Sequence, residues 1–375
     1  MTPMSRRDLS PEELTCMAVR DALEDAGLSA SEVGIVLAAN ALGGCLNGQS
    51  CIRGQTWLKP VGLDGVGVIN VDNSCAGGAS AFHLGVMAAA SGQSPVLVVG
   101  TEKMWTGSRA DTISGIEEGL PASERPVLRE TYSHASSTLM GMNSVWVNHQ
   151  VAARGTTLEQ IAATAVKSRR FGEMNPLAQF RKPVSVDEVL DSPVVASPLT
   201  RLMCSSFTDG AAALVLASGR VPDAPRVLAS VVRSGTGDTE YHDRLGGVAE
   251  EGWKAAGAGP ADIDLIELHD ATSAEELYAL EAMGFFPPGD AGAATVAGAT
   301  GPGGQSVCVN PSGGLVSRGH PIGATGLCQI YEVVQHLKGR AGARQVHGAR
   351  LAATVNTGGL INADPALVSV VVVER

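Results

Sequence analysis

The chain is poor in aromatic residues, in positive charge and in long apolar runs. Aromatic side chains make up 4% of its 375 residues, so the core must be built mainly from Ala, Val and Leu. Lys and Arg number 27 against 38 Asp and Glu, and this acidic balance argues against binding to a nucleic-acid backbone. No apolar run reaches the roughly 18–20 residues that a membrane-spanning helix needs. We therefore expect neither nucleic acid nor a membrane as a partner.

The cysteines lack the spacing of a structural metal site. The sequence contains no Cys-x-x-Cys pair, so we expect no bound metal. An odd number of scattered thiols is typical of a reducing compartment, and we expect a cytoplasmic protein. The seven cysteines stand at positions 16, 45, 51, 75, 204, 308 and 328.

One cysteine, Cys75, stands in a turn of small residues, NSCAGG, ahead of an apolar run from Ala79 to Ala90. A helix without a polar face is usually buried on all sides, so this run predicts a central helix. Val96–Gly100 has the pattern of a buried strand. The free N–H groups and the dipole at a helix start favour a thiolate. Cys75 is therefore a candidate nucleophile, and a buried structural cysteine is the alternative.

A second stretch repeats this design. When Gly78-Ala79-Ser80 is aligned with Gly323-Ala324-Thr325, His320 falls opposite Cys75. Further upstream, residues 21–40 match residues 251–270, each as a helix that ends at a glycine and is followed by a strand. Such a repeat predicts two similar α/β halves about a pseudo-two-fold axis, which would bring Cys75 and His320 to one site.

The repeat also suggests where the halves meet. We expect an N-terminal half over 1–222, a C-terminal half over 223–375, and an insertion at about 105–200 that caps the site. In the second half a strand, 226–233, precedes the first helix, whereas the first half has no such strand. Either the first half has lost this strand or the sequence starts late, and a misassigned start codon is the preferred explanation.

Three stretches, NSCAGG, HDATSAEELYALEAMGF and NPSGGLVSRGHPIGATG, in this order, resemble the thiolase superfamily, in particular the sterol-carrier-protein-type branch and its bacterial and archaeal relatives. The resemblance covers nearly the whole chain. It implies two similar βαβαβαββ halves, a loop domain inserted in the first half, and a homodimer through that half. It also implies a reaction that makes or breaks a carbon–carbon bond beside a thioester carbonyl, with the acyl group carried on a cysteine.

The resemblance assigns roles to single residues. Cys75 would be the nucleophile, His320 its base and His269 an oxyanion-hole donor, with the N–H groups of Gly358 and Cys75 forming a second oxyanion hole. These residue types suit the chemistry, because a base of near-neutral pKa suffices to activate a thiol and one oxyanion donor is worth about 3 kcal/mol. The resemblance also implies substrate-binding residues in NPSGG, namely Asn310, Ser312, Gly313 and Gly314.

The chain departs from the family at the second cysteine that shuttles the α-proton in many thiolases. Asn356 and Ala271 occupy the two positions where that cysteine is found. His320, His269 or a water would then have to remove the α-proton, or a decarboxylation would replace this step. We expect the remaining histidines to be structural: His83 in the core, and His134, His149, His242, His336 and His347 on the surface or in loops.

Three classes of function stay open. The first is an acyltransferase for Claisen condensation or thiolysis, acting on thioesters of coenzyme A or of a carrier protein without another cofactor. The second is an aldolase-type carbon–carbon lyase, and the third is a non-catalytic subunit. Relatives in this branch often work with a small OB-fold, zinc-ribbon protein, and we expect such a partner here. The densest cations of the insertion, at 167–170, either contact a ligand or form a solvated helix face.

Overall fold

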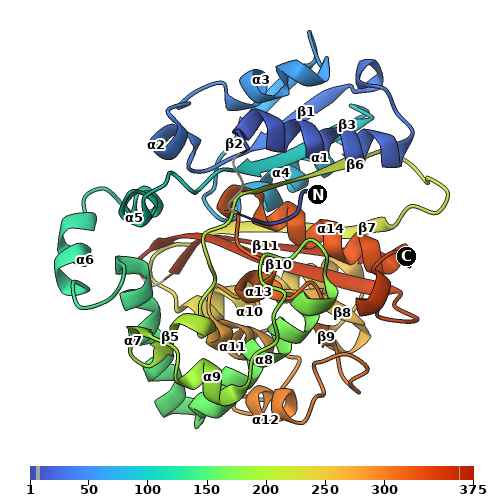
Figure 1. The fold of residues 1–375 in the computed structure, drawn as a ribbon. Coiled ribbons are helices and arrows are strands. Elements are labelled where there is room, and N and C mark those ends of the chain that lie inside the picture. The colour runs from blue at the N-terminus through green and yellow to red at the C-terminus, as the bar shows by residue number, and fades with distance from the viewer. Residues whose placement is uncertain (6–8, 363) are drawn as a thin grey trace.

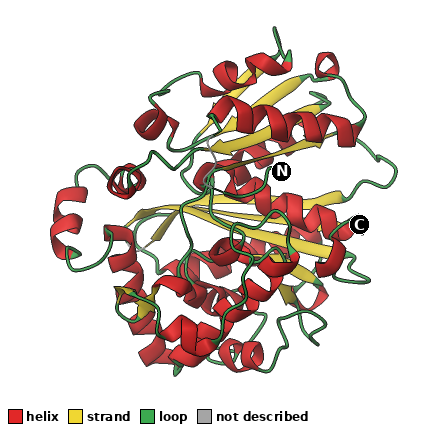
Figure 2. Ribbon diagram, viewed as in Figure 1, coloured by secondary structure: helices red, strands yellow, loops and turns green. Residues whose placement is uncertain are grey.

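Two β-sheets are stacked with helices between them and on both outer faces (Figures 1 and 2). The computed structural model describes residues 1–5, 9–362 and 364–375. The first sheet has the order β2-β1-β3-β6 and the second the order β7-β11-β10-β8-β9. The predicted α/β fold of two similar halves is confirmed.

The first half consists of a sheet with helices on both faces and the insertion between β3 and β6. Its core elements are α1 (Pro11–Ala26), β1 (Ile35–Ala39), α2 (Gly43–Asn47), α3 (Arg53–Leu58), β2 (Gly67–Val71), α4 (Gly77–Ala90), β3 (Val96–Glu102) and β6 (Gly210–Leu216). The insertion contains α5 (Arg109–Glu117), α6 (Arg125–Thr131), α7 (Thr138–Arg154), α8 (Leu158–Met174), α9 (Val186–Leu190), β4 (Val194–Ala196) and β5 (Leu199–Thr200).

The second half repeats the order of the first without a large insertion. Its elements are β7 (Arg226–Ser234), α10 (Tyr241–Ala256), β8 (Leu265–Glu267), α11 (Ser273–Ala282), α12 (Ala291–Val296), β9 (Cys308–Val309), α13 (Gly314–Ser317), α14 (Thr325–Leu337), β10 (Leu351–Ile361) and β11 (Asp364–Glu374). Strand β7 lies at the edge of its sheet, beside β11. Among the described residues, the first half has no counterpart of β7 beside β6, as its sequence predicts.

The two central helices, α4 and α14, meet at glycines between the sheets (Figure 1). A Cβ on Gly326 would lie 2.5 Å from the backbone nitrogen of Ala79, and one on Gly78 would lie 3.0 Å from the carbonyl oxygen of Gly323. Side chains other than glycine would push the helices apart, so the repeated glycine motif is what lets the two helix starts approach each other.

Helix α4 is not buried on every side in the single chain, contrary to the expectation from its composition. Leu84 is 38% and Met87 56% exposed, and Ile69 on the neighbouring edge strand β2 is 49% exposed. These side chains give the first half an uncovered apolar area.

The residues at the helix ends adopt the capping conformations that are typical of their sequence. Ser10 and Glu13 form a capping box at the start of α1, which satisfies backbone N–H groups there. The helices α1 and α10 end at Gly27 and Gly257, both in the left-handed conformation. Among the described residues, no helix is both long and apolar enough to cross a bilayer.

The insertion has two parts. Helices α5 and α6 lie at the side of the body, whereas α7 packs against β4 and α11, and α8 packs against α11, α12 and α13 (Figure 1). Residues of the insertion and of both halves line one cavity, which contains the candidate site.

Candidate active site

Cys75 is held in a tight turn between β2 and α4. Ser74 has a positive φ of 51°, and two hydrogen bonds close the turn, from Ala76 N–H to the Asn73 carbonyl and from Gly77 N–H to the Ser74 carbonyl, both at 3.0 Å. A positive φ at a residue other than glycine is uncommon and indicates a position under constraint. The turn places Cys75 directly before α4, as the glycine pattern predicts.

His320 lies in the loop that leads into α14. Its backbone N–H donates to the Thr208 hydroxyl at 3.0 Å, and its ring Nδ1 lies 2.7 Å from the hydroxyl of Thr325. Because the Thr325 hydroxyl engages Nδ1, Nε2 is the nitrogen left to act on a neighbouring group.

His269 follows β8 and faces His320. Their ring centroids are 5.1 Å apart, and one ligand atom from each histidine and from Cys75 lie within 4.8 Å of one another. Nδ1 of His269 lies 3.1 Å from the Thr357 hydroxyl, whereas the buried Nε2 has no hydrogen-bond partner within residues 1–5, 9–362 and 364–375. An unpaired buried donor is costly, which fits a nitrogen reserved for substrate.

Gly358 on β10 closes the site against the Cys75 turn. A Cβ at this position would lie 2.4 Å from both the backbone nitrogen of Ala76 and the carbonyl oxygen of Asn73. Only glycine fits there without displacing the turn, so the backbone of β10 and the turn before α4 are in direct contact.

Burial sets the protonation of the three side chains. It raises the pKa of the Cys75 thiol to about 12 and lowers the pKa of His269 to about 4. Burial, His269 and Arg318 hold the pKa of His320 well below its usual range. The resting site is therefore a neutral thiol beside two neutral imidazoles, and the thiol proton must leave as the sulfur attacks.

These residues form the floor of a cavity of about 1390 Å³. Its walls come from both halves and from the insertion, including Leu128, Tyr132, Met140 and Trp146. Such a volume exceeds what a small acyl group requires and leaves room for the arm that carries it.

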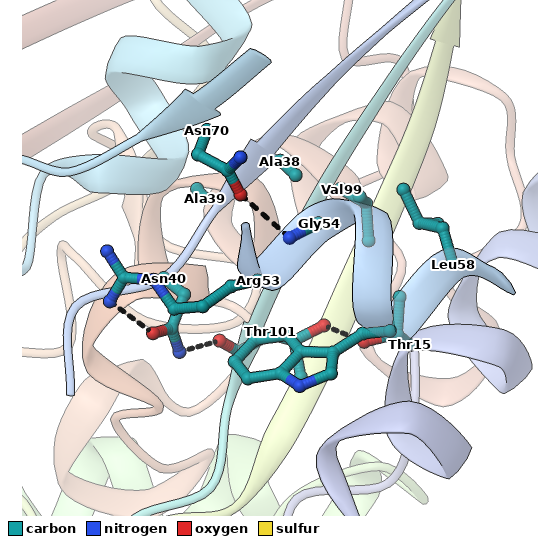
Figure 3. A pocket seen from close by; sticks show the side chains of 11 residues that line it. Thr15, Ala38, Ala39, Asn40, Arg53, Gly54, Leu58, Asn70, Val99 and Thr101 are labelled. Atoms are coloured by element: carbon teal, nitrogen blue, oxygen red, sulfur yellow. Dashed lines mark hydrogen bonds between the residues drawn. The ribbon is translucent and has the colours of Figure 1, made fainter. Parts of the chain in front are cut away.

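A second hollow, shown in Figure 3, is filled by packing and hydrogen bonds. Asn40 donates to the Thr101 carbonyl at 2.7 Å, Arg53 donates to the Asn40 amide oxygen at 2.8 Å, and Gly54 N–H donates to Asn70 at 2.7 Å. Its volume of about 10 Å³ is no larger than one water needs, so we assign it no ligand.

The four residues of NPSGG predicted to bind substrate lie beside the site, fully buried. None of them is among the described residues that line the cavity. Asn310 donates to Glu276 at 2.8 Å and accepts from Leu268 N–H at 2.7 Å, and the Ser312 hydroxyl donates to Glu267 at 2.7 Å. Gly313 and Gly314 have φ values of 101° and 61°. The hydrogen bonds of Asn310 and Ser312 hold the segment that ends in His269.

Among the titratable residues that line the cavity and that sequence reasoning missed are Glu275 and Cys204. The backbone of Cys204 forms a bridge with Thr272, and the Glu275 carboxylate accepts the Thr272 N–H at 2.8 Å. Burial raises the pKa of Glu275 to about 8 and that of Cys204 to about 12. A long-range bridge brings Cys204 here, and no local pattern in the sequence announces it.

Two histidines expected at the surface or in loops are buried, so that prediction was wrong. His242 is 4% exposed, because it stacks on Trp146 with ring centroids 4.5 Å apart. His336 is 2% exposed and accepts the Val346 N–H at 3.1 Å. His149 lines the cavity, and His83, only half-buried, lies 3.0 Å from the Ser230 hydroxyl.

The one group in the described part of the chain with the spacing of metal ligands is the site itself, Cys75, His269 and His320. All three have catalytic uses without a metal. The absence of a metal stays a prediction.

Comparison with known proteins identifies the family. The model for the thiolase N-terminal domain matches residues 1–220, and the model for the thiolase C-terminal domain-like family matches residues 243–370. The chain belongs to the thiolase family. It is an enzyme of the acyltransferase type that forms or breaks a carbon–carbon bond beside a thioester carbonyl through an acyl-cysteine intermediate.

Curated relatives cover nearly the whole thiolase chain. It is 35% identical over 366 residues to the acetyl-CoA acetyltransferase of Methanothermobacter thermautotrophicus, which covers 94% of this chain and 92% of the relative. It is 34% identical over 374 residues to sterol carrier protein 2 of Bos taurus, covering 92% of this chain and 66% of the relative. The solved structure of an Ltp2–ChsH2(DUF35) aldolase shares the fold, with a TM-score of 0.82 and 20% identity over 100% of this chain and 96% of that one.

Proposed function

We propose that Cys75 carries the acyl group and that His320 is its base. The Cys75 sulfur attacks the thioester carbonyl carbon while its proton passes to Nε2 of His320. The carbon–sulfur bond to the carrier then breaks, and the departing thiolate takes the proton from the imidazolium. Atoms and charge balance, and the site returns to a neutral histidine.

The observation that carries this proposal is the meeting of Cys75, His269 and His320 within 4.8 Å on the floor of one cavity. A thiol of pKa about 12 does not ionise alone at neutral pH, so it needs an adjacent acceptor. The neutral imidazole of His320 is that acceptor.

His269 and Gly358 stabilise negative charge in this proposal. Tyr241 OH lies 2.9 Å from the Thr357 hydroxyl, which in turn lies 3.1 Å from Nδ1 of His269. If the tyrosine donates to the threonine, the threonine donates to Nδ1, and Nε2 of His269 then carries its own proton. This Nε2–H can donate to a thioester enolate, while the N–H groups of Cys75 and Gly358 hold the oxygen of the acyl-enzyme.

The α-proton of the second thioester falls to His320. With its Nε2 protonated, His269 has no free lone pair in the cavity and cannot serve as the base. The positions of the family's second cysteine are Ala271 and Asn356. After acylation, His320 is neutral again and stands at the same place.

The NPSGG segment acts indirectly in this proposal. Asn310, Ser312, Gly313 and Gly314 fix the backbone around His269 and so shape the substrate site without contacting substrate. On the basis of the internal repeat, the chain is divided into an N-terminal half, 1–222, and a C-terminal half, 223–375.

A homodimer in the cytoplasm completes the proposed working form. The uncovered apolar area at Ile69, Leu84 and Met87 lies on the first half, at an edge strand and the central helix α4. Exposed apolar areas of this kind favour association. Light scattering on the purified chain tests the dimer, and a monodisperse monomer would contradict it.

A small partner protein is proposed as well, of the OB-fold, zinc-ribbon type. The solved aldolase with the same fold pairs Ltp2 with ChsH2(DUF35), which supports such an arrangement. Activity that rises on adding a partner from the same gene neighbourhood would support the proposal. Full condensation activity of the homodimer alone, with ordinary affinity for coenzyme A, would count against it.

Intact-protein mass spectrometry after incubation with a panel of acyl-CoA thioesters tests the proposed chemistry. We expect a mass increase equal to the acyl group, located on Cys75. Carbon–carbon cleavage without any adduct would favour an aldolase-type lyase, the class of the solved structure with the same fold. Neither adduct nor turnover with any thioester would favour a non-catalytic subunit.

A further inference from the structure

The cations at 167–170 do not form a solvated helix face. Lys167 and Arg169 of α8 are each 7% exposed, and only Arg170 projects to solvent. Lys167 is paired with the buried carboxylate of Glu276. Arg169 instead lines the cavity that contains Cys75.

Arg169 is a buried cation that has no counter-ion among the described residues. Its guanidinium carbon lies 4.4 Å from the ring centroid of Phe180, and its buried Nε has no hydrogen-bond partner in the part of the chain that the structure describes. Within the described ranges, no carboxylate pairs with it, and burial alone lowers its pKa. The other two buried arginines near α13 and α14 differ, because Arg318 pairs with Glu267 and Arg344 with Glu332.

Such a group is expensive to keep. A buried charge is normally paired, since removing it from water costs several kcal/mol that only a partner can offset. Stacking on an aromatic ring returns only part of that cost. A guanidinium left free on a cavity wall therefore suggests that the missing anion arrives with the ligand.

The position of Arg169 relates this anion to the reacting centre. Phe180 N–H donates to the Ser317 carbonyl at 3.0 Å, and Gln179 N–H donates to the Arg318 carbonyl at 2.9 Å. Ser317 ends α13, and Arg318 begins the loop that leads to His320. Phe180, whose ring lies against the Arg169 guanidinium, is therefore hydrogen-bonded to the segment that contains His320.

We propose that Arg169 binds a carboxylate on the acyl group, so that the preferred substrates are thioesters of dicarboxylic acids. This inference rests on the proposed acyl transfer to Cys75. A guanidinium is planar and presents paired N–H donors that match a carboxylate. The phosphates of coenzyme A are the other anionic source, but they lie at the far end of the pantetheine arm, away from the thioester.

Among the described residues, four glutamates line the cavity, Glu117, Glu124, Glu240 and Glu275, and Glu117 is already paired with Arg129. Glu275 lines the same cavity, but burial raises its pKa to about 8, so it is mostly protonated at pH 7. A protonated carboxyl does not repel the substrate and can donate a hydrogen bond.

The test compares succinyl with butyryl thioesters, which have the same chain length, on coenzyme A and on N-acetylcysteamine, which has no phosphate. The rate of Cys75 acylation is followed by mass spectrometry in the wild type, Arg169→Met, Arg169→Lys and the surface control Arg170→Met. We expect Arg169→Met to slow succinyl transfer by about tenfold to a hundredfold on both carriers. Butyryl transfer and the Arg170→Met variant should be unchanged, and Arg169→Lys should retain part of the rate.

Each other outcome has a distinct meaning. Equal slowing of both coenzyme A thioesters, with no effect on either N-acetylcysteamine thioester, would assign Arg169 to a phosphate and overturn the inference. Adducts that form equally fast from all four thioesters in every variant would also overturn it, while leaving the acyl transfer intact. No adduct from any thioester in the wild type would instead contradict the proposed function.

A binding measurement covers the case in which the variant fails to fold. Succinate should raise the melting temperature of the wild type more than butyrate at equal concentration, because only the dicarboxylate offers a free anion to Arg169 when its other end lies at the oxyanion holes. Equal shifts from both acids would count against the inference.

Discussion

The hydroxyl of Thr357 lies 3.1 Å from Nδ1 of His269, and this contact determines which nitrogen of the histidine faces the cavity. The same hydroxyl lies 2.9 Å from Tyr241 OH. His320 has a threonine at its own Nδ1, Thr325, at 2.7 Å. If Tyr241 donates to Thr357, His269 presents an N–H to substrate, whereas His320 presents a lone pair when its Nδ1–H donates to Thr325. One ring is then a donor and the other a base.

Thr357→Val tests this division. The change removes the donor to Nδ1 and leaves the tautomer of His269 unfixed, so we expect carbon–carbon bond formation to fall by about tenfold to a hundredfold. Acylation of Cys75 should be unchanged, because His320 performs it. Thr357→Ser restores the hydroxyl and serves as the matched control. Equal loss of both half-reactions would show that the two histidines do not have separate roles.

Cys75→Ala is expected to abolish the acyl adduct and all turnover. Cys204→Ala is the sharpest control, because Cys204 is the second thiol among the described residues that line the cavity. Cys45→Ala and Cys308→Ala should also retain the adduct. Peptide mapping after acylation locates the label, and label on any other cysteine while Cys75 stays free would contradict the assignment.

The resting protonation predicts an unusual pH profile. Because the pKa of His320 lies well below its usual value of 6.5, the imidazole stays unprotonated, and able to accept the thiol proton, on the acidic side of neutrality. Because the pKa of Cys75 is about 12, the thiol does not ionise by itself near neutral pH. The acylation rate therefore should not rise with pH through thiolate formation in this range. We expect kcat/KM for acylation to be nearly constant between about pH 6 and pH 8. An inflection near pH 6.5 would show that the histidine titrates normally.

The pairing of Cys75 with His320 was predictable because short-range glycine patterns determine it. Gly78 and Gly326 permit the close contact of α4 and α14, and the repeat of their motif places Cys75 and His320, the two residues proposed to be catalytic, at equivalent helix starts. The helix ends at Gly27 and Gly257 follow from equally local rules.

What the sequence could not predict depends on contacts between distant segments. Cys204 reaches the cavity through its bridge to Thr272, and His242 is buried by Trp146 from the insertion. Arg169 belongs to a run of cations that look alike in the sequence. Tertiary packing alone pairs Lys167 with Glu276 and leaves Arg169 on the cavity wall. The apolar composition of α4 predicted burial on all sides, whereas Leu84 and Met87 are exposed in the single chain.

Gly358→Ala is expected to damage the site through a direct collision. The added methyl carbon would lie 2.4 Å from the backbone at Asn73 and Ala76, so the Cys75 turn must shift. We expect a loss of about 1–3 kcal/mol in stability and a larger proportional loss of acylation. Gly247→Ala is the matched control, since a Cβ there meets nothing within 4 Å in helix α10. That variant should be neutral or slightly more stable in urea unfolding. Wild-type acylation by Gly358→Ala would show that the turn tolerates displacement.

Glu102 predicts how stability depends on pH. Its buried carboxyl accepts N–H groups from Ala41 and Leu42 of the first half, each at 3.0 Å, and from Gly323 of the second half at 2.9 Å. Burial nevertheless raises its pKa from 4.5 to about 7, so the folded state holds this proton more tightly than the unfolded chain. Unfolding therefore releases a proton between these values. The stabilising contribution is fully present below about pH 4.5 and is lost as the pH rises through about 7.

Glu102→Gln removes this titration and is expected to flatten the decline of unfolding free energy between pH 5 and pH 8, by an amount on the order of 3 kcal/mol. At pH 5 the variant should be less stable than the wild type, because an amide does not reproduce the hydrogen bonds of the carboxyl group. Urea unfolding at both pH values measures the difference, with the exposed Glu250→Gln as the matched control. If wild type and Glu102→Gln lose stability in parallel from pH 5 to pH 8, Glu102 is not the group that releases the proton. The other buried carboxyls with raised pKa values, Glu267, Asp270 and Glu275, then become the groups to test.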